Sequence, residues 1–212
     1  MPDFSVKNLH VFRGERHLIK GLGFELEAGT CLQVSGANGA GKTTLLRVLC
    51  GLLEPESIHL SWRGVECSPR DPRYHEEISY LGHDPALKAD MTAIENLRFS
   101  VGLRRRVDDR DIDAALARVG AKAFVDRPVR ALSAGQRRRV ALAALWLVGS
   151  TAWLLDEPAT NLDTTGQALV ASMIDEQLSR GGFVIAATHQ DLGLASRHLK
   201  VLQLDSGQGV SA

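Results

Sequence analysis

The stretch GANGAGKTT, residues 36–44, decides the fold class of this 212-residue chain. From Gly36 to Thr43 it fits the pattern G-x-x-x-x-G-K-[ST] residue for residue, with an apolar strand pattern before it (TCLQVS, 30–35) and a helical pattern after it (TTLLRVLCGL, 43–52). A strand, a glycine-rich loop and a helix in this order form a cradle in which backbone N–H groups and a helix N-terminus face a phosphate. A glycine-rich turn with a chance lysine is the alternative, which the flanking strand and helix disfavour.

This loop predicts a site for a nucleoside triphosphate. We expect Lys42 to reach the β- and γ-phosphates and Thr43 to ligate Mg²⁺. The residues of the loop predicted to contact the nucleotide are Gly36, Ala37, Asn38, Gly39, Ala40, Gly41, Lys42, Thr43 and Thr44.

Two carboxylates follow the apolar strand pattern AWLL, residues 152–155. If that strand ends beside the phosphate loop, Asp156 would hold Mg²⁺ and Glu157 would polarise the attacking water as general base. Apolar runs that end in aspartate are common, and a solvated acidic residue at a strand end is the alternative for Glu157. The presence of the phosphate loop in the same chain favours the catalytic interpretation.

His189 follows another buried strand pattern, GFVIAAT, residues 182–188. A lone histidine at a strand end is often structural. Ligands in parallel α/β proteins nevertheless bind at the carboxyl ends of the strands, so the sequence predicts that this imidazole contacts the γ-phosphate and responds to its presence.

A second glycine-bearing helix start, LSAGQ, occupies residues 132–136. Ser133 stands at an N-cap position and Gly135 lies in the first turn, which suits an anion. The motif falls in a helical part of the chain, away from the phosphate loop. We therefore expect a twofold dimer in which LSAGQ of one copy contacts the nucleotide on the other copy. An ordinary capped surface helix is the alternative.

The order of strand and helix patterns predicts one domain of 212 residues. Apolar strand patterns lie towards both ends, whereas residues from about 90 to 148 contain only helical patterns. We expect an α/β core (about 1–89 and 149–206) with an inserted helical lobe (about 90–148) and a disordered tail at 207–212. The predicted strands are residues 4–12, 23–29, 30–36, 77–82, 151–156, 182–189 and 198–204.

Polar and glycine caps mark the predicted helix ends. Thr92 and Glu95 have capping-box spacing, and Gly120 stands where a C-cap would follow the pattern DIDAALARV. A long helix is expected from about Thr164 to Arg180, ended by two glycines. The apolar run 140–155 is broken by Gly-Ser-Thr, which indicates a buried helix followed by a buried strand and not a membrane span.

Composition excludes several classes of partner and compartment. The chain has 25 basic and 25 acidic residues, and no aromatic residues interleave with the arginine runs 104–106 and 137–139, so we expect solvated helix faces there and no nucleic-acid partner. The three cysteines lack metal-ligand spacing, which indicates reduced thiols with Cys31 and Cys50 in the core. The N-terminus does not have the pattern of a signal peptide.

The motifs GANGAGKTT, LSAGQ, LLDEP, TNLD and TH, in this order, resemble those of the ATP-binding cassette ATPases of membrane transporters. The resemblance covers nearly the whole chain. It implies a P-loop NTPase (RecA-like) core with a small antiparallel β subdomain and an inserted helical lobe, and it makes ATP with Mg²⁺ the ligands.

The same resemblance implies roles for individual residues. Phe12, where tyrosine is commoner, would stack on adenine, and Asp163 of TNLD would lie on the dimer seam. Glu157 becomes the catalytic base and His189 the γ-phosphate contact, while His83 replaces the glutamine that most such ATPases have. The residues expected to contact the nucleotide of the other copy are Leu132, Ser133, Ala134, Gly135, Gln136 and Asp163.

Within that superfamily, residues 74–99 and 132–147 look most like the ATP-binding subunit of the haem exporter of bacterial cytochrome c maturation. This resemblance implies integral membrane permease partners, a peripheral place on the cytoplasmic face of the inner membrane, and work that delivers haem to a periplasmic haem chaperone. An export ATPase for another small substrate is one alternative. A soluble cassette ATPase acting in translation or DNA repair is another, although such proteins usually carry tandem cassettes or long insertions.

Overall fold

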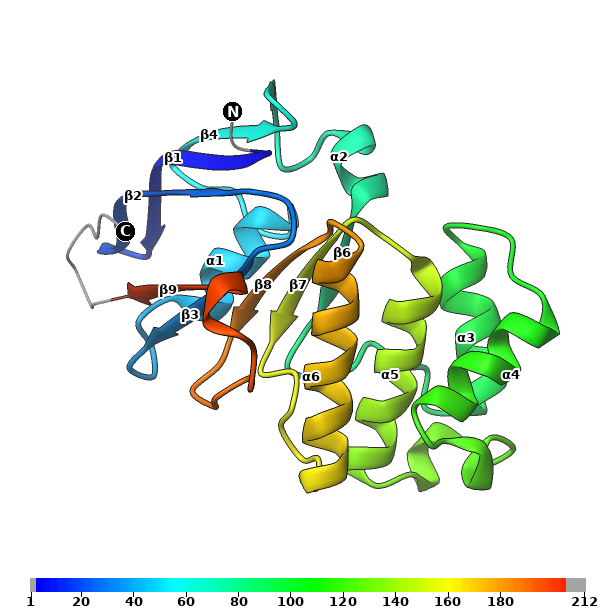
Figure 1. Cartoon of the computed structure of the whole chain (residues 1–212). Helices are drawn as coiled ribbons and strands as arrows, with labels where there is room; N and C mark the ends of the chain where they lie inside the picture. Colours follow the sequence, from blue (N-terminus) through cyan, green and yellow to red (C-terminus); the bar gives the residue numbers. More distant parts are fainter. Residues whose placement is uncertain (1–2, 205–212) are drawn as a thin grey trace.

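The computed structural model describes residues 3–204, which form two β-sheets and a helical segment (Figure 1). The strands are β1 (Phe4–Arg13), β2 (Arg16–Leu26), β3 (Cys31–Gly36), β4 (Ser57–Trp62), β5 (Val65–Cys67), β6 (Ile78–Leu81), β7 (Ala152–Asp156), β8 (Phe183–Ala187) and β9 (Leu199–Leu204). The α-helices are α1 (Lys42–Leu49), α2 (Pro72–Glu77), α3 (Ala93–Gly102), α4 (Asp109–Arg118), α5 (Ala134–Val148) and α6 (Thr164–Ser179). Three short 3₁₀ helices are η1 (Lys122–Phe124), η2 (Val129–Ala131) and η3 (Ser196–His198).

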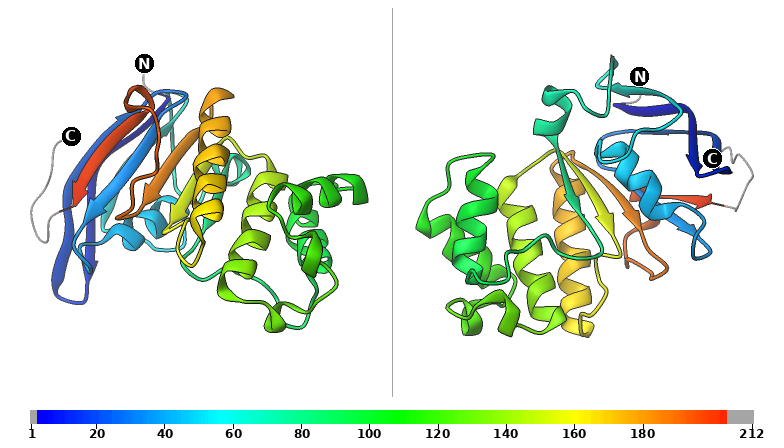
Figure 2. Two further views of the ribbon diagram at one scale, coloured as in Figure 1. Left: turned by 60° about the horizontal axis from the view of Figure 1, so that its bottom comes forward. Right: turned by 180° about the vertical axis from the view of Figure 1, so that it is seen from behind.

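A five-stranded parallel sheet in the order β6-β7-β8-β3-β9 forms the centre of the protein. Its inner strands are apolar on both faces because both faces are covered. Leu154 and Ile185 belong to the core on the side of α1, whereas Trp153 and Val184 belong to the core on the side of α5 and α6. Figure 2 shows α1 from behind, between this sheet and the antiparallel one. The parallel sheet and its P-loop NTPase arrangement confirm the predicted fold class.

The register of the parallel strands brings three strand ends to one level. Ala187 of β8 pairs with Val34 of β3 on one side and with Asp156 of β7 on the other. The loops that follow β3, β7 and β8 therefore all leave the sheet at the same edge. This edge carries the residues that sequence analysis selected.

A four-stranded antiparallel sheet, in the order β2-β1-β4-β5, covers the other side of α1. Sequence analysis located β1 and the second half of β2, but the first half of β2 and the whole of β4 and β5 were missed. The residues of β5 are mostly exposed, and Leu60 and Trp62 are the buried side chains of β4. Short strands with so few buried positions have little apolar periodicity, and pairing with a neighbour decides their conformation.

The segment between β6 and β7 is helical, with α3, α4, η1, η2 and α5. Thr92 and Glu95 form a capping box at the start of α3, as predicted. α4 ends one position before Val119, and Gly120 follows with φ 67°, the left-handed conformation that favours glycine. α6 begins at Thr164, also as predicted.

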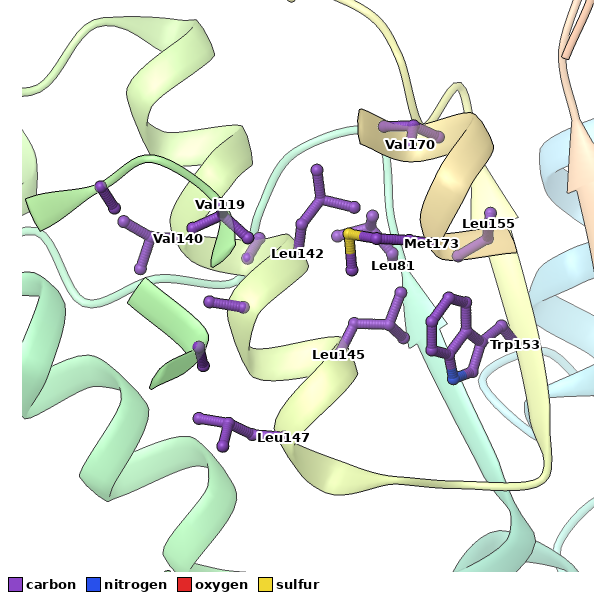
Figure 3. Packing of buried hydrophobic residues seen from close by; sticks show 14 of the residues in the cluster. Leu81, Val119, Val140, Leu142, Leu145, Leu147, Trp153, Leu155, Val170 and Met173 are labelled. Carbon is purple, nitrogen blue, oxygen red and sulfur yellow. The ribbon is translucent and has the colours of Figure 1, made fainter. Parts of the chain in front are cut away.

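Helix α5 lies between the parallel sheet and helices α3 and α4. In Figure 3, Leu142 and Leu145 point towards Trp153 and Met173, whereas Leu147 lies on the opposite side of the helix. Residues 140–148 of α5 are all apolar, and all of them are buried or half-buried, as expected for a helical stretch that is apolar on every side. The helical segment and the sheet therefore share one continuous hydrophobic cluster.

The cysteine thiols agree with the predicted burial. Cys31 is fully buried, Cys50 is 6% exposed, and all three cysteines are free. Burial raises the pKa of the Cys31 thiol to about 12, so this group stays protonated and unreactive at neutral pH.

Two arginines of the run 104–106 anchor the helical segment. Arg104 is exposed, yet its guanidinium donates to the carbonyl oxygens of Ile78, His75 and Glu76 at 2.7, 2.7 and 3.1 Å and to Ser79 Oγ at 3.1 Å. Arg105 Nε donates to the Leu147 carbonyl at the end of α5, at 2.6 Å. Both side chains are exposed, as expected for a solvated helix face, but the sequence did not predict that they would bond to backbone carbonyls.

Two further expectations concern the rest of the chain. The tail predicted for residues 207–212 lies outside the described residues. Within residues 3–204, no helix combines the length and apolar character needed to cross a bilayer.

The buried side chain of Asn96 holds the turn that leads into α3. Its Oδ1 accepts from the Lys88 N–H at 2.8 Å, and its Nδ2 donates to the carbonyl oxygens of Lys88, Met91 and Thr92 at 3.0, 3.2 and 3.0 Å. Asn96 is 2% exposed. Water therefore cannot replace these bonds.

We expect Asn96→Leu to lower the free energy of unfolding by about 2–3 kcal/mol, because it leaves buried backbone groups unsatisfied. Arg98→Ala on the exposed face of the same helix should change it by less than about 1 kcal/mol. Urea denaturation of both variants measures the difference. Equal losses would contradict this account of the turn.

Candidate active site

The loop between β3 and α1 has the geometry of a phosphate cradle. Gly36, Gly39 and Gly41 have φ values of 141°, 81° and 112°, which side chains other than glycine rarely adopt. A Cβ at Gly36 would also lie 2.3 Å from the carbonyl oxygen of Leu204 in β9. The loop therefore needs glycine at this position for both conformation and space.

Lys42 begins α1 and folds back over the loop. Its Nζ donates to the carbonyl oxygens of Gly36 and Ala37, at 2.7 and 3.2 Å. The ammonium group thus lies over the loop, at the N-terminus of a helix, where positive charge and backbone N–H groups act together on an anion.

A pocket of about 560 Å³ opens beside this loop, a volume in the usual range for small-molecule sites. It brings together many of the predicted residues, namely Asn38, Gly39, Gly41, Lys42, Thr43, Thr44, His83, Asp156, Glu157 and His189. Four lining residues were not predicted, namely Arg13, Leu18, Thr160 and Gln190. Thr160 is the first residue of the motif TNLD, from which only Asp163 was assigned a role, whereas no quoted motif contains Arg13, Leu18 or Gln190.

Asp156 ends β7 with its side chain almost fully buried, at 2% exposure. Its Oδ2 has no hydrogen-bond partner within residues 3–204. A buried carboxylate oxygen without a partner is costly unless a cation or an ordered water meets it. Asp156 and Thr43 line the same pocket, and both offer the oxygen ligands that Mg²⁺ prefers.

Protein side chains alone do not make a complete metal site here. In the described part of the chain, no group of three or more His, Cys, Asp or Glu side chains is placed to hold a metal ion. Mg²⁺ commonly takes one or two protein ligands and completes its shell with phosphate oxygens and water. The residues present therefore fit an ion that arrives with a nucleotide.

Glu157 adopts a left-handed backbone conformation, with φ 48°. Its N–H donates to the carbonyl of Ala187 at 2.8 Å, and its Oε2 accepts from Thr188 Oγ1 at 3.3 Å. His189 Nε2 lies 3.9 Å from Glu157 Oε1, and this histidine side chain is 49% exposed. The ends of β7 and β8 thus bring a carboxylate and an imidazole side by side, although 32 residues lie between the end of β7 and His189 in the chain.

The predicted residues Gly36, Ala37 and Ala40 belong to the loop but do not line the pocket. Phe12 does not line it either, whereas the next residue, Arg13, does. The Phe12 ring is 47% exposed and stacks on His17, with centroids 4.1 Å apart and an interplanar angle of 18°. The ring thus lies on the β1–β2 hairpin, next to a pocket residue.

The motif LSAGQ lies away from this pocket. Ser133 and Gln136 form a capping box at the start of α5, as the N-cap prediction required, and none of residues 132–136 lines the pocket. In Figure 1 the start of α5 lies at the bottom of the molecule, apart from the loop between β3 and α1 on the left. A Cβ at Gly135 would lie 2.6 Å from the Asn161 carbonyl, so glycine allows α5 to approach the loop after β7.

Asp163 is exposed and caps α6. Its Oδ1 accepts from the Gly166 N–H at 2.8 Å and from Arg139 Nη2 at 3.0 Å. The Gly166 N–H, together with the positive charge of Arg139, holds the pKa of the Asp163 carboxyl below its usual value. Asp163 therefore stays ionised near neutral pH, next to the start of α5.

Arg138 contradicts the expectation that residues 137–139 form a solvated face, because it is only 2% exposed. Its guanidinium extends from α5 to the backbone of the pocket loops. Sequence analysis missed this contact, since one arginine in a run of three carries no signal of which side chain turns inward.

A family of known proteins matches this chain over the part that contains the phosphate loop and both carboxylates. A sequence model of the ABC transporter family matches residues 19–160. The chain belongs to the ABC transporter ATP-binding family. The family assignment implies that this cassette ATPase binds a nucleotide.

Curated relatives of this cassette ATPase match over nearly their full length. The "Cytochrome c biogenesis ATP-binding export protein CcmA" of Methylococcus capsulatus is 48% identical over 88% of this chain and 90% of the relative. The protein of the same name from Escherichia coli K12 is 43% identical over 96% and 97%. A solved structure from Pyrococcus furiosus, a "Putative ABC transporter (ATP-binding protein)", superposes with a TM-score of 0.81 at 24% identity and covers 95% of this chain and 96% of its own.

We expect Gly36→Ala to lower the free energy of unfolding by about 2–4 kcal/mol, because it adds backbone strain and overpacking against β9. The matched control is Gly64→Ala in the β4–β5 turn, which also has positive φ, 76°, but has nothing within 4 Å of the added Cβ. Urea denaturation should show a loss of about 1 kcal/mol for the control. A loss at Gly36 no larger than the control would contradict the close approach of β9.

Proposed function

We propose that this chain is the ATP-hydrolysing subunit of an export ABC transporter for cytochrome c biogenesis, and that it couples hydrolysis to delivery of haem to a periplasmic haem chaperone. The observation that carries the proposal is the pocket at the ends of β3, β7 and β8, which brings phosphate-binding and acid–base groups together. The relatives named as cytochrome c biogenesis export proteins, at 41–48% identity over most of the chain, support the specific pathway.

The glycine-rich loop holds the triphosphate. Its backbone N–H groups bind the phosphate oxygens, and Lys42 turns its ammonium from the loop carbonyls to the β- and γ-phosphates. Exchange of two neutral carbonyl acceptors for anionic phosphate oxygens adds Coulomb attraction between opposite charges to the hydrogen bonds of the ammonium group. Phe12, with its half-exposed ring on the adjacent hairpin, stacks on the adenine.

Thr43 and Asp156 hold the magnesium ion that accompanies ATP. When bound, Mg²⁺ neutralises the negative charge that develops on the phosphate oxygens. The partnerless Oδ2 of buried Asp156 supports this assignment.

Glu157 acts as general base towards the attacking water. Its carboxylate is partly exposed to the pocket, and the Thr188 hydroxyl orients one of its oxygens. His189, beside the other carboxylate oxygen, donates a hydrogen bond to the γ-phosphate. His83 also lines the pocket, in the loop that leads to the helical segment, and contacts the nucleotide from there.

A second copy of the chain completes each site. Residues 132–136 and Asp163 lie outside the pocket of their own chain, while the N-terminus of α5 exposes Ser133 and Ala134. These groups suit the triphosphate on a twofold-related copy, because a helix start offers free N–H groups to an anion. The homodimer then has two composite sites.

The family assignment gives the ATPase a membrane permease as partner. We place the chain at the cytoplasmic face of the bacterial inner membrane, bound to permease subunits of the cytochrome c maturation system. The helical segment 90–148 acts as the lobe that follows the nucleotide state and moves the permease.

We expect Glu157→Gln to abolish ATP turnover while ATP still binds, because the amide retains the shape of the side chain and loses the basic oxygen. Lys42→Ala should instead weaken ATP binding, since it removes the charge that meets the phosphates. Calorimetric titration with ATP and phosphate release, both on the full chain, separate the two effects. Full turnover by Glu157→Gln would overturn the assignment of the base.

We expect Ser133→Trp to leave ATP binding to the single chain intact but to prevent ATP-dependent dimers, because the bulky ring blocks the start of α5. Glu157→Gln provides the background that retains ATP. Light scattering with and without ATP measures the mass of each protein. If the double variant, which carries both Ser133→Trp and Glu157→Gln, forms as much dimer with ATP as Glu157→Gln alone, the composite site is contradicted.

A further inference from the structure

Arg138 uses every donor of its guanidinium on backbone carbonyls. Nε donates to Pro158 O at 3.0 Å, Nη2 to Asp156 O and Glu157 O at 2.6 and 2.5 Å, and Nη1 to Gly82 O and His83 O at 2.6 and 3.3 Å. A guanidinium has five N–H groups in a fixed planar fork, so all five are matched here.

These five bonds join three segments that are far apart in the sequence. One is the start of α5, where Arg138 lies five residues, or about 7.5 Å along the helix axis, after Ser133. The second is the loop after β6, which carries His83. The third is the loop after β7, which carries the carboxylates of Asp156 and Glu157.

The hydrogen bond from Arg138 to the Glu157 carbonyl stabilises a strained backbone conformation at Glu157. A non-glycine residue in the left-handed region costs about 1–3 kcal/mol and persists only when its surroundings hold it. Three hydrogen bonds hold the peptide groups of Glu157: its N–H to Ala187 O, its carbonyl from Thr160 N, and its carbonyl from Arg138 at the shortest of the three distances. Arg138 is the one side chain among these partners.

The positive charge of Arg138 lies near two carboxylates of opposite charge, those of Asp156 and Glu157. Burial lowers the pKa of its guanidinium, and the nearby carboxylates of Asp156 and Glu157 act in the opposite direction. An arginine remains protonated at physiological pH even so. The site therefore contains a permanent buried cation that contacts the backbone of both carboxylate residues and does not line the pocket.

We propose that Arg138 is a positioning residue that fixes Asp156 and Glu157 in their working orientation and ties them to His83 and to the start of α5. This inference rests on the proposed function. Because one rigid planar group holds all three segments, movement of the LSAGQ helix start and alignment of the catalytic carboxylates occur together. ATP binding itself depends mainly on the loop after β3, which Arg138 does not contact.

Arg104 provides a matched control. It too donates to several backbone carbonyls through a planar guanidinium, at the α2–β6 junction, and it does not line the nucleotide pocket. Replacement by lysine keeps the charge and reduces the five fixed donors to three on a flexible stem in both cases. A merely structural role for Arg138 would make the two replacements equivalent.

The test compares Arg138→Lys and Arg104→Lys in the full chain, assembled with its membrane partner for kinetics. We expect both variants to lose stability in urea and to bind ATP within about threefold of the unmodified chain. The kcat of Arg138→Lys should fall about 10–100-fold, since displacement of a catalytic group by about 1 Å has an effect of that order. The kcat of Arg104→Lys should stay within about twofold. Equal kcat values for the two variants would overturn the proposal.

A measurement on the unmodified chain covers the case in which Arg138→Lys does not fold. Amide hydrogen exchange of the full chain, with and without ATP, reports the segments 82–83, 156–158 and 134–140 separately. If Arg138 holds them as one body, ATP slows exchange in all three by a similar factor. Protection confined to 156–158 would contradict the proposal.

Glu157→Gln, measured in parallel, separates the two levels of inference. If Glu157→Gln hydrolyses ATP normally, the proposed function fails. If Glu157→Gln is inactive and Arg138→Lys keeps the kcat of Arg104→Lys, the proposed function stands and only the role of Arg138 fails.

Discussion

The common level of three parallel strand ends is the constraint on which the site depends. Ala187 pairs with both Val34 and Asp156, so the chain leaves β3, β7 and β8 at one edge. Parallel pairing points every carboxyl end in the same direction, and the loops then gather residues from distant parts of the sequence. A slip of one residue in the pairing of β7 with β8 would turn Asp156 to the opposite face of the sheet.

Burial on both faces keeps this register. The inner strands alternate their side chains between two hydrophobic clusters, one containing α1 and the antiparallel sheet and the other containing α5 and α6. Helix α5 is itself buried on two sides, so the helical segment shares its core with the sheet. A change at the start of α5 is therefore mechanically connected to the strands that carry the carboxylates.

Buried polar side chains determine the details that hydrophobic packing leaves open. Asn96 satisfies the backbone of the turn before α3, and Arg138 satisfies five carbonyls at the junction of α5 with the pocket loops. Hydrophobic burial is non-directional, whereas a planar guanidinium or carboxamide bonds in fixed directions. These two residues set the position of loops that apolar contacts alone would allow to shift.

The sequence by itself determined the phosphate loop, the capping box at Thr92, the N-cap at Ser133 and the carboxylates after β7, because each depends on residues that are close together in the chain. It located β4, β5 and the first half of β2 poorly, since pairing partners and not local periodicity form these strands. Only the tertiary structure decided that His189 lies beside Glu157, that Phe12 lies next to the pocket and not in its lining, and that Arg138 turns inward. The physical reason is that these contacts join segments which only the folded sheet and the packed α5 bring together.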